Sequence, residues 1–154
     1  MKPLETTVEE VLRKAIQSEV DTRAWYQKMA ERAASPAVQK RMLEFADEEL
    51  VHRAKLERKY REEIGKPAPE PHVPKPELPS DAYDLDMARA LKMALERERD
   101  SESYFRFMAE RVPDTELGHL FMELAEIEWK HKTDLQAEYN SAVAGDPEQF
   151  LLDI

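Results

Sequence analysis

The sequence predicts an all-α protein: a four-helix bundle made of two duplicated helical hairpins joined by a long crossover. Apolar residues recur at alternating steps of three and four along four segments, which is the pattern of a helix with one buried face. The chain of 154 residues has only 3 Gly, and 36% of its residues are charged, as in proteins made of long helices. At this length and with 42% hydrophobic residues, one domain with a proper core is expected.

The second half of the chain repeats the first without a gap. A shift of 79 residues (128 − 49) carries the segment Glu49-Leu-Val-His52 onto Glu128-Trp-Lys-His131. The same shift aligns Glu19 with Glu98, Met29-Ala-Glu-Arg32 with Met108-Ala-Glu-Arg111, Leu56 with Leu135, and Tyr60 with Tyr139. An internal repeat of this kind indicates that one structural unit occurs twice.

The first hairpin is expected over residues 7–64. A capping-box pattern, Thr7-Val-Glu-Glu10, starts its first helix, and Ser35-Pro36 ends that helix and opens the second. The predicted core face of the first helix is Val8, Leu12, Ala15, Glu19, Thr22, Tyr26, Met29 and Ala33. That of the second helix is Val38, Met42, Phe45, Glu49, His52 and Leu56.

Residues 65–80 form the predicted crossover, because six prolines exclude a helix there and favour an extended chain. Sixteen residues at about 3.1 Å each span roughly 50 Å, close to the length of a 30-residue helix at about 1.5 Å per residue. The crossover can therefore run the length of the bundle, as in bundles with one long connection. A flexible tether between separate hairpins is the alternative, but it would leave the core face of each hairpin exposed.

The second hairpin is expected over residues 81–144, beginning near Ser80-Asp81, with a turn at Pro113-Asp114. Its third helix presents Met87, Leu91, Ala94, Glu98, Ser101, Phe105, Met108 and Val112. Its fourth presents Leu117, Phe121, Leu124, Glu128, His131 and Leu135. Gly145 ends the fourth helix and the domain, 1–145. An apolar tail, 146–154, follows and is expected to dock on this bundle or on another subunit.

Composition excludes several classes of function. A net charge of −10 argues against nucleic acid or an anionic membrane as the main partner. The sequence has no apolar run of the roughly 20 residues that a membrane helix needs and no signal-peptide pattern, so a cytoplasmic protein is expected. Without Cys, thiolate metal sites, disulfides and thiol catalysis are excluded.

Six polar residues interrupt the four core faces near mid-helix: Glu19, Glu49, His52, Glu98, Glu128 and His131. Four buried carboxylates are costly unless they are protonated or compensated, and two divalent cations would cancel their charge. The oxygen and nitrogen donors suit iron or manganese. An apo bundle in which the Glu and His side chains pair with one another is the alternative.

These motifs resemble the rubrerythrin branch of the ferritin-like superfamily, over residues 8–141. The resemblance implies two iron ions, with Glu19 and Glu98 as terminal ligands, Glu49 and Glu128 as bridging ligands, and His52 and His131 as imidazole ligands. It also implies reduction of hydrogen peroxide at a di-iron centre. Tyr26, two turns beyond Glu19, resembles a tyrosine near the metals, and a plain core aromatic is the other interpretation.

The chain departs from that family pattern in two respects. It has no Cys-rich rubredoxin domain, so electrons must come from an external donor if it is a peroxidase. The family's additional Glu one turn before Glu98 is replaced by Leu95. Glu102, one turn after Glu98, could substitute, but its counterpart in the first half is Arg23. A solvated Glu102–Arg23 pair or simple surface charge is the alternative.

Several aromatic and histidine residues have simpler interpretations. Packing is expected of Trp25, Tyr104, Phe105 and Trp129, and solvent exposure is expected of His72 and His119.

Three functions remain: a peroxidase acting on hydrogen peroxide or oxygen, a ferroxidase or iron-handling protein, and a non-catalytic metal-stabilised interaction module with the tail as docking peptide. A homodimer is the expected assembly.

Overall fold

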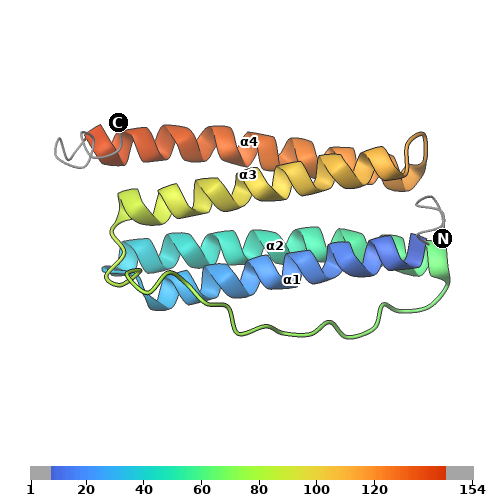
Figure 1. The fold of residues 1–154 in the computed structure, drawn as a ribbon, viewed down its shortest axis with the longest axis horizontal. Coiled ribbons are helices and arrows are strands. Elements are labelled where there is room, and N and C mark those ends of the chain that lie inside the picture. Colours follow the sequence, from blue (N-terminus) through green and yellow to red (C-terminus); the bar gives the residue numbers. More distant parts are fainter. Residues whose placement is uncertain (1–7, 145–154) are drawn as a thin grey trace. The chain divides into compact units, whose positions relative to one another are not determined.

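The computed structural model describes residues 8–144, and these form four helices (Figure 1). They are α1 (Val8–Glu31), α2 (Pro36–Ile64), α3 (Met87–Arg111) and α4 (Glu116–Ala144). Within this part of the chain the only pairing of strand type is an isolated bridge between Ala33 and Leu85. The expected cap at Thr7, the helix stop at Gly145 and the apolar tail lie outside the described residues.

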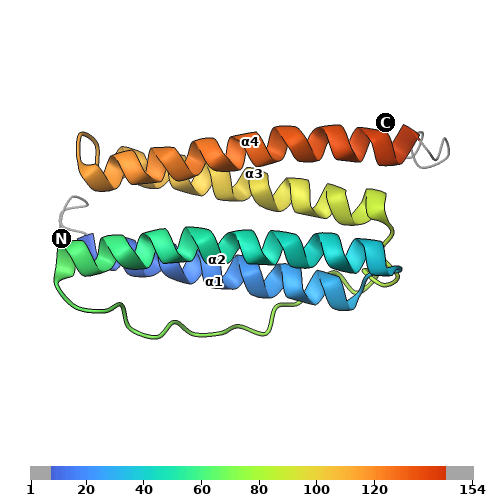
Figure 2. The same ribbon diagram turned by 180° about the vertical axis from the view of Figure 1, so that it is seen from behind.

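The chain divides into two compact units, each containing one helical hairpin. The first comprises residues up to Glu31 together with Lys40–Ala82, and the second comprises Arg32–Gln39 together with the residues from Tyr83 onward. In both views, α2 lies alongside α1, and α4 lies alongside α3 (Figures 1 and 2). The repeat detected in the sequence is therefore a repeat of structural units.

The first hairpin is held by its core face and by a capped turn. The Tyr26 ring of α1 packs on the Phe45 ring of α2, with ring centroids 5.3 Å apart. Ser35 Oγ accepts a hydrogen bond from the backbone N–H of Val38 at 3.3 Å, directly before Pro36 at the first helical position. This is the Ser cap and N-terminal Pro that the sequence predicts.

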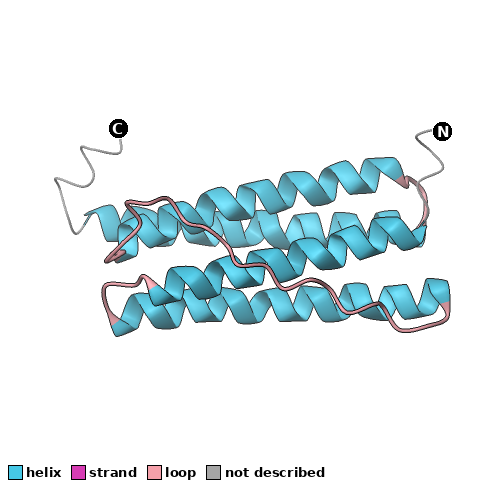
Figure 3. Ribbon diagram, turned by 60° about the horizontal axis from the view of Figure 1, so that its bottom comes forward, coloured by secondary structure: helices cyan, strands magenta, loops and turns pink. Residues whose placement is uncertain are grey.

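Gly65 ends α2 in a left-handed conformation (φ +81°), and its N–H donates to the Arg61 carbonyl at 2.9 Å. The crossover that follows is a continuous non-helical segment, as Figure 3 shows. The side chain of Gln17 in α1 bonds the backbone of His72 twice: Nε2 donates to its carbonyl at 2.6 Å, and Oε1 accepts from its N–H at 3.0 Å. The crossover is thus bound to the first hairpin at His72.

The third helix begins at Met87, so the predicted start near Ser80-Asp81 is wrong. The chain before α3 is bound elsewhere: Leu85 N–H donates to the Arg32 carbonyl at 2.8 Å, and the Leu85 carbonyl accepts from Ala34 N–H at 2.9 Å. Leu85 therefore cannot join a helix. The Asp86 side chain then caps α3 by accepting from the Arg89 N–H at 2.8 Å.

The turn between α3 and α4 forms at Pro113-Asp114, as predicted, with Asp114 in the left-handed region (φ 57°). Thr115 Oγ1 donates to the Val112 carbonyl at 2.6 Å and accepts from Gly118 N–H at 2.9 Å. A Cβ at Gly118 would lie 2.3 Å from the Val112 carbonyl oxygen, so only glycine fits this close approach.

Most residues of the predicted core faces are buried, although Val8 at the start of α1 is 37% exposed. Phe105 stacks on Phe121 across the second hairpin, with centroids 6.2 Å apart, and Tyr104 packs edge-on against Phe105. Packing of Trp25 is also confirmed, by its edge contact with Tyr26. Packing of Trp129 is wrong: its side chain is 52% exposed because it lies off the core face of α4.

His72 and His119 are exposed, as expected. Over the described range 8–144, no helix is both long enough and apolar enough to span a membrane.

Candidate metal centre

The first hairpin brings together three of the predicted ligands: Glu19 from α1, and Glu49 and His52 from α2. One ligand atom from each lies within 4.8 Å of the other two, and all three side chains are buried. His52 Nδ1 is 3.5 Å from Glu19 Oε2 and 3.6 Å from Glu49 Oε2. Because residues three apart lie on the same helix face, the side chains of Glu49 and His52 both lie on the face of α2 that meets Glu19 of α1.

Burial around this cluster makes the charged form of a carboxylate costly. Glu48, the neighbour of Glu49, is half-buried, and burial raises its pKa despite the opposing charge of Arg41. Glu49 and His52 are each only 3% exposed. Carboxylates at this level of α2 therefore need either a compensating cation or a proton.

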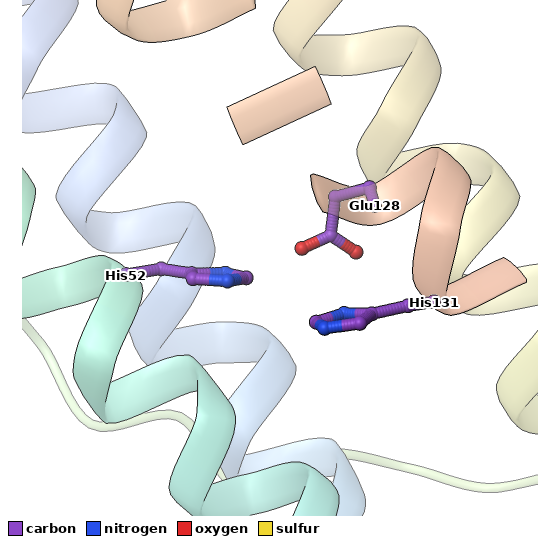
Figure 4. Close-up of side chains that lie close together, drawn as sticks. All are labelled: His52, Glu128 and His131. Carbon is purple, nitrogen blue, oxygen red and sulfur yellow. The ribbon is translucent and has the colours of Figure 1, made fainter. Parts of the chain in front are cut away.

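The second hairpin gathers the equivalent three residues: Glu98 from α3, and Glu128 and His131 from α4. Ligand atoms of Glu98 and Glu128 lie within 4.8 Å of each other, as do those of Glu128 and His131. Figure 4 shows Glu128 and His131 projecting from neighbouring turns of α4 toward the same side, with His52 extending from α2. Glu98 is 1% exposed and Glu128 is fully buried, while His131 is half-buried.

Glu102 lies one turn beyond Glu98 and is held by two cations of its own hairpin. Lys132 Nζ donates to Glu102 Oε1 at 2.7 Å, and Arg106 Nε donates to Oε2 at 2.8 Å. Burial alone would raise the pKa of Glu102, but these hydrogen bonds and charges outweigh it and hold the pKa below its ordinary value. The interpretation of Glu102 as simple surface charge is wrong, since the residue is only 9% exposed.

Lys132 was not predicted as a residue of the site, although it ties Glu102 to α4. A signal was present: Glu102 lies four residues after Glu98 and so falls on the buried side of α3. A buried carboxylate there requires a cation from the neighbouring helix, and Lys132, directly after His131, is placed to supply it. With both oxygens occupied, Glu102 is better described as a structural ion pair than as a substitute ligand.

Tyr26 is fully buried in α1, seven residues beyond Glu19. Its ring lies 5.3 Å from the Trp25 ring and 5.3 Å from the Phe45 ring, measured between centroids. The ring contacts agree with Tyr26 being a core aromatic residue. Its position on the same face of α1 as Glu19 agrees with its being a tyrosine near the metals. Both interpretations of Tyr26 therefore stand.

The donor set fits a metal that prefers oxygen and imidazole ligands. Each hairpin contributes two buried carboxylates and one imidazole, the set preferred by iron and manganese, and the chain has no thiolate to offer a softer metal. The pattern of one Glu on the first helix and Glu-x-x-His on the second is that of di-metal carboxylate bundles. Fold and site together define a helical protein whose carboxylate and imidazole groups could hold metal.

Comparison with known proteins agrees with this class. Residues 10–139 match the Rubrerythrin family, and the chain belongs to that family.

Among solved structures, a hypothetical protein from Pyrococcus furiosus is 28% identical, with a TM-score of 0.63 over 88% of this chain and 90% of that one. No curated protein matches the sequence. The predicted fold class, an all-α ferritin-like four-helix bundle, is confirmed by these similarities.

Proposed function

We propose that the two three-residue clusters together hold two iron ions and that the protein reduces hydrogen peroxide with electrons from a separate donor. The observation that carries the proposal is the duplication: each hairpin places two buried carboxylates and one imidazole at equivalent positions. Membership of the Rubrerythrin family, a family of ferritin-like di-iron proteins, supports the same assignment.

The residues have distinct roles in this proposal. Glu19 and Glu98 would each serve as a terminal ligand, Glu49 and Glu128 as ligands shared by the two ions, and His52 and His131 as imidazole ligands. Four carboxylates balance the charge of two divalent ions, which removes the cost of burying them.

The apolar core around these residues keeps bulk water away from the ligands and holds their side chains in one arrangement. Two bound ferrous ions would each supply one electron, and these two electrons with two protons from solvent would reduce one peroxide molecule to two water molecules. Because the chain contains no Cys, no rubredoxin-type centre on it can resupply those electrons, and an external reductant is required.

The direct test is peroxide turnover by protein loaded anaerobically with ferrous iron, with a chemical reductant in excess. We expect peroxide consumption in the natural chain and its loss in Glu49→Ala. Glu44→Ala is the matched control, because Glu44 is an exposed carboxylate of the same helix outside the cluster. Normal turnover by Glu49→Ala would overturn the proposal, and turnover with manganese in place of iron would move it to that metal.

Iron handling is the second candidate, and the net charge of −10 favours it because an acidic protein attracts ferrous ions. The two functions differ in whether the metal stays in place. Iron still bound after several rounds of oxidation, measured after desalting, supports the peroxidase, and iron released or exchanged in each round supports the ferroxidase.

We also propose a homodimer as the assembly, because closed symmetric dimers are the commonest soluble oligomers. Sedimentation equilibrium tests this directly, and a monomer mass across the concentration range would contradict it. A chain that binds a protein partner but turns over neither peroxide nor iron would instead support the interaction module.

A further inference from the structure

One cation of the first hairpin, Arg23, lies partly buried on the core face of α1. It follows Glu19 by four residues and precedes Tyr26 by three, and both of these residues contact α2. The Nε atom of Arg23 is buried and has no hydrogen-bond partner within residues 8–144. A buried donor of this kind is costly unless an acceptor binds it.

The second hairpin shows which position lies opposite Arg23. A shift of 79 residues (102 − 23) carries Arg23 onto Glu102. The same shift carries Arg53 of α2 onto Lys132 of α4. Lys132 Nζ donates to Glu102 Oε1 at 2.7 Å, so these two positions meet between the helices of their hairpin. We therefore expect Arg23 and Arg53 to meet in the same way between α1 and α2.

The directions of the two side chains agree with this expectation. The helices α1 and α2 run in opposite directions (Figure 1), as the contacts of Glu19 with His52 and of Tyr26 with Phe45 also require. A helical side chain leans toward the N-terminus of its own helix. In an antiparallel pair, the side chains of Arg23 and Arg53 therefore lean toward each other.

The two hairpins differ in charge at these positions. In the second hairpin one carboxylate binds two cations, Lys132 and Arg106. In the first hairpin both positions carry a guanidinium group. Arg53 Nε donates to Glu57 at 3.1 Å, but the Glu57 side chain is 39% exposed, and exposed ion pairs of this kind contribute little. Two guanidinium groups that approach each other repel unless an anion lies between them.

We propose that Arg23 and Arg53 form a binding site for a small oxyanion that carries a phosphate group, separate from the six proposed metal ligands. Guanidinium groups bind phosphate oxygens through pairs of parallel N–H donors. The anion supplies the negative charge that the Glu102 carboxylate supplies in the second hairpin. The Arg53 side chain is 23% exposed, so the site is reached from solvent.

Isothermal titration calorimetry with inorganic phosphate tests the proposal. The full chain is titrated as purified and after chelator treatment, because an anion could also bind a metal, and chloride at equal ionic strength is the reference. We expect binding in both forms, weakened about tenfold or more in Arg23→Met and in Arg53→Met, the loss expected for hydrogen bonds to a charged group. Phosphoserine is titrated in parallel, and its binding would show that the site also takes a phosphate group carried by a larger molecule.

Arg58→Met is the matched control, because Arg58 is an exposed arginine of the same helix as Arg53. It should bind phosphate as the natural chain does.

Arg23→Glu tests the site even if the Met variants fold poorly. It gives the first hairpin the carboxylate that the second hairpin has, so the new side chain should pair with Arg53 and no anion is needed. Phosphate should raise the Tm of the natural chain above its value in chloride, and it should leave the Tm of Arg23→Glu unchanged.

Absence of both a binding heat and a phosphate-dependent rise in Tm in the natural chain would overturn the proposal. Phosphate binding that survives both Arg23→Met and Arg53→Met, or that disappears when the metal is removed, would also overturn it, because phosphate would then bind elsewhere. None of these outcomes bears on the proposed metal centre, since neither arginine is a proposed ligand.

Discussion

Replacing Lys132 with Met should destabilise the second hairpin through Glu102. The ammonium group of Lys132 lies 2.7 Å from Glu102 Oε1, and the two side chains are only 27% and 12% exposed, so solvent screens the pair weakly. Loss of a hydrogen bond to a charged group costs about 1.5–3 kcal/mol. Because Arg106 still binds the other oxygen at 2.8 Å, we expect about 2 kcal/mol rather than the cost of an unpaired buried charge.

The assay is urea unfolding of chelator-treated protein, so that bound metal makes no contribution. Lys130→Met is the matched control, because Lys130 is exposed and its loss should change the free energy of unfolding by less than about 0.5 kcal/mol. A change for Lys132→Met no larger than the control's would refute the reasoning.

The pH dependence of the same comparison gives a second check. The folded-state pKa of Glu102 is lowered from its ordinary value of 4.5, so the stabilisation is present in full above that pH and is lost as the pH falls through the folded pKa. The difference between the natural chain and Lys132→Met should therefore shrink in acid. A difference that stays constant into acid would contradict the assignment of the effect to ionised Glu102.

Four further predictions concern turns, caps and metal. Gly118→Ala should destabilise by about 1–3 kcal/mol in urea unfolding, because its Cβ would lie 2.3 Å from the Val112 carbonyl oxygen. Gly65→Ala should cost less, about 1 kcal/mol, since no atom lies within 4 Å and only the left-handed backbone opposes it; the reverse order would contradict the steric argument. Asp86→Ala should cost about 1 kcal/mol by removing the cap of α3, and an unchanged unfolding midpoint would show that the cap is dispensable. Ferrous iron should raise the Tm of the natural chain but have much less effect on Glu128→Ala, and an equal rise would exclude Glu128 as a ligand.

The helices and the two buried clusters could be predicted because both follow from the spacing of residues three and four apart along the sequence. Glu49 and His52 fall on the same face by spacing alone, and the repeat carries the same arrangement to Glu128 and His131. The start of α3 could not be predicted, since the backbone of Leu85 is occupied by Arg32 and Ala34, a contact between distant parts of the chain that no local pattern encodes.

The same limit applies to side chains near the clusters. Glu102 could be recognised as a polar residue near the core face, but its binding to Lys132 depends on the packing of α3 against α4. Trp129 was predicted to pack from its residue type, whereas its position on α4 leaves it half-exposed.

Metal content per chain tests the central claim most directly. Elemental analysis of protein purified without metal-affinity resin, then loaded anaerobically with ferrous iron, should give about two iron ions per chain. The Glu49→Ala and Glu128→Ala variants should each hold fewer, because each change removes a proposed bridging carboxylate. A natural chain that retains no metal after loading would contradict the account, since the buried carboxylates would then be compensated by protonation or by pairing with the histidines alone.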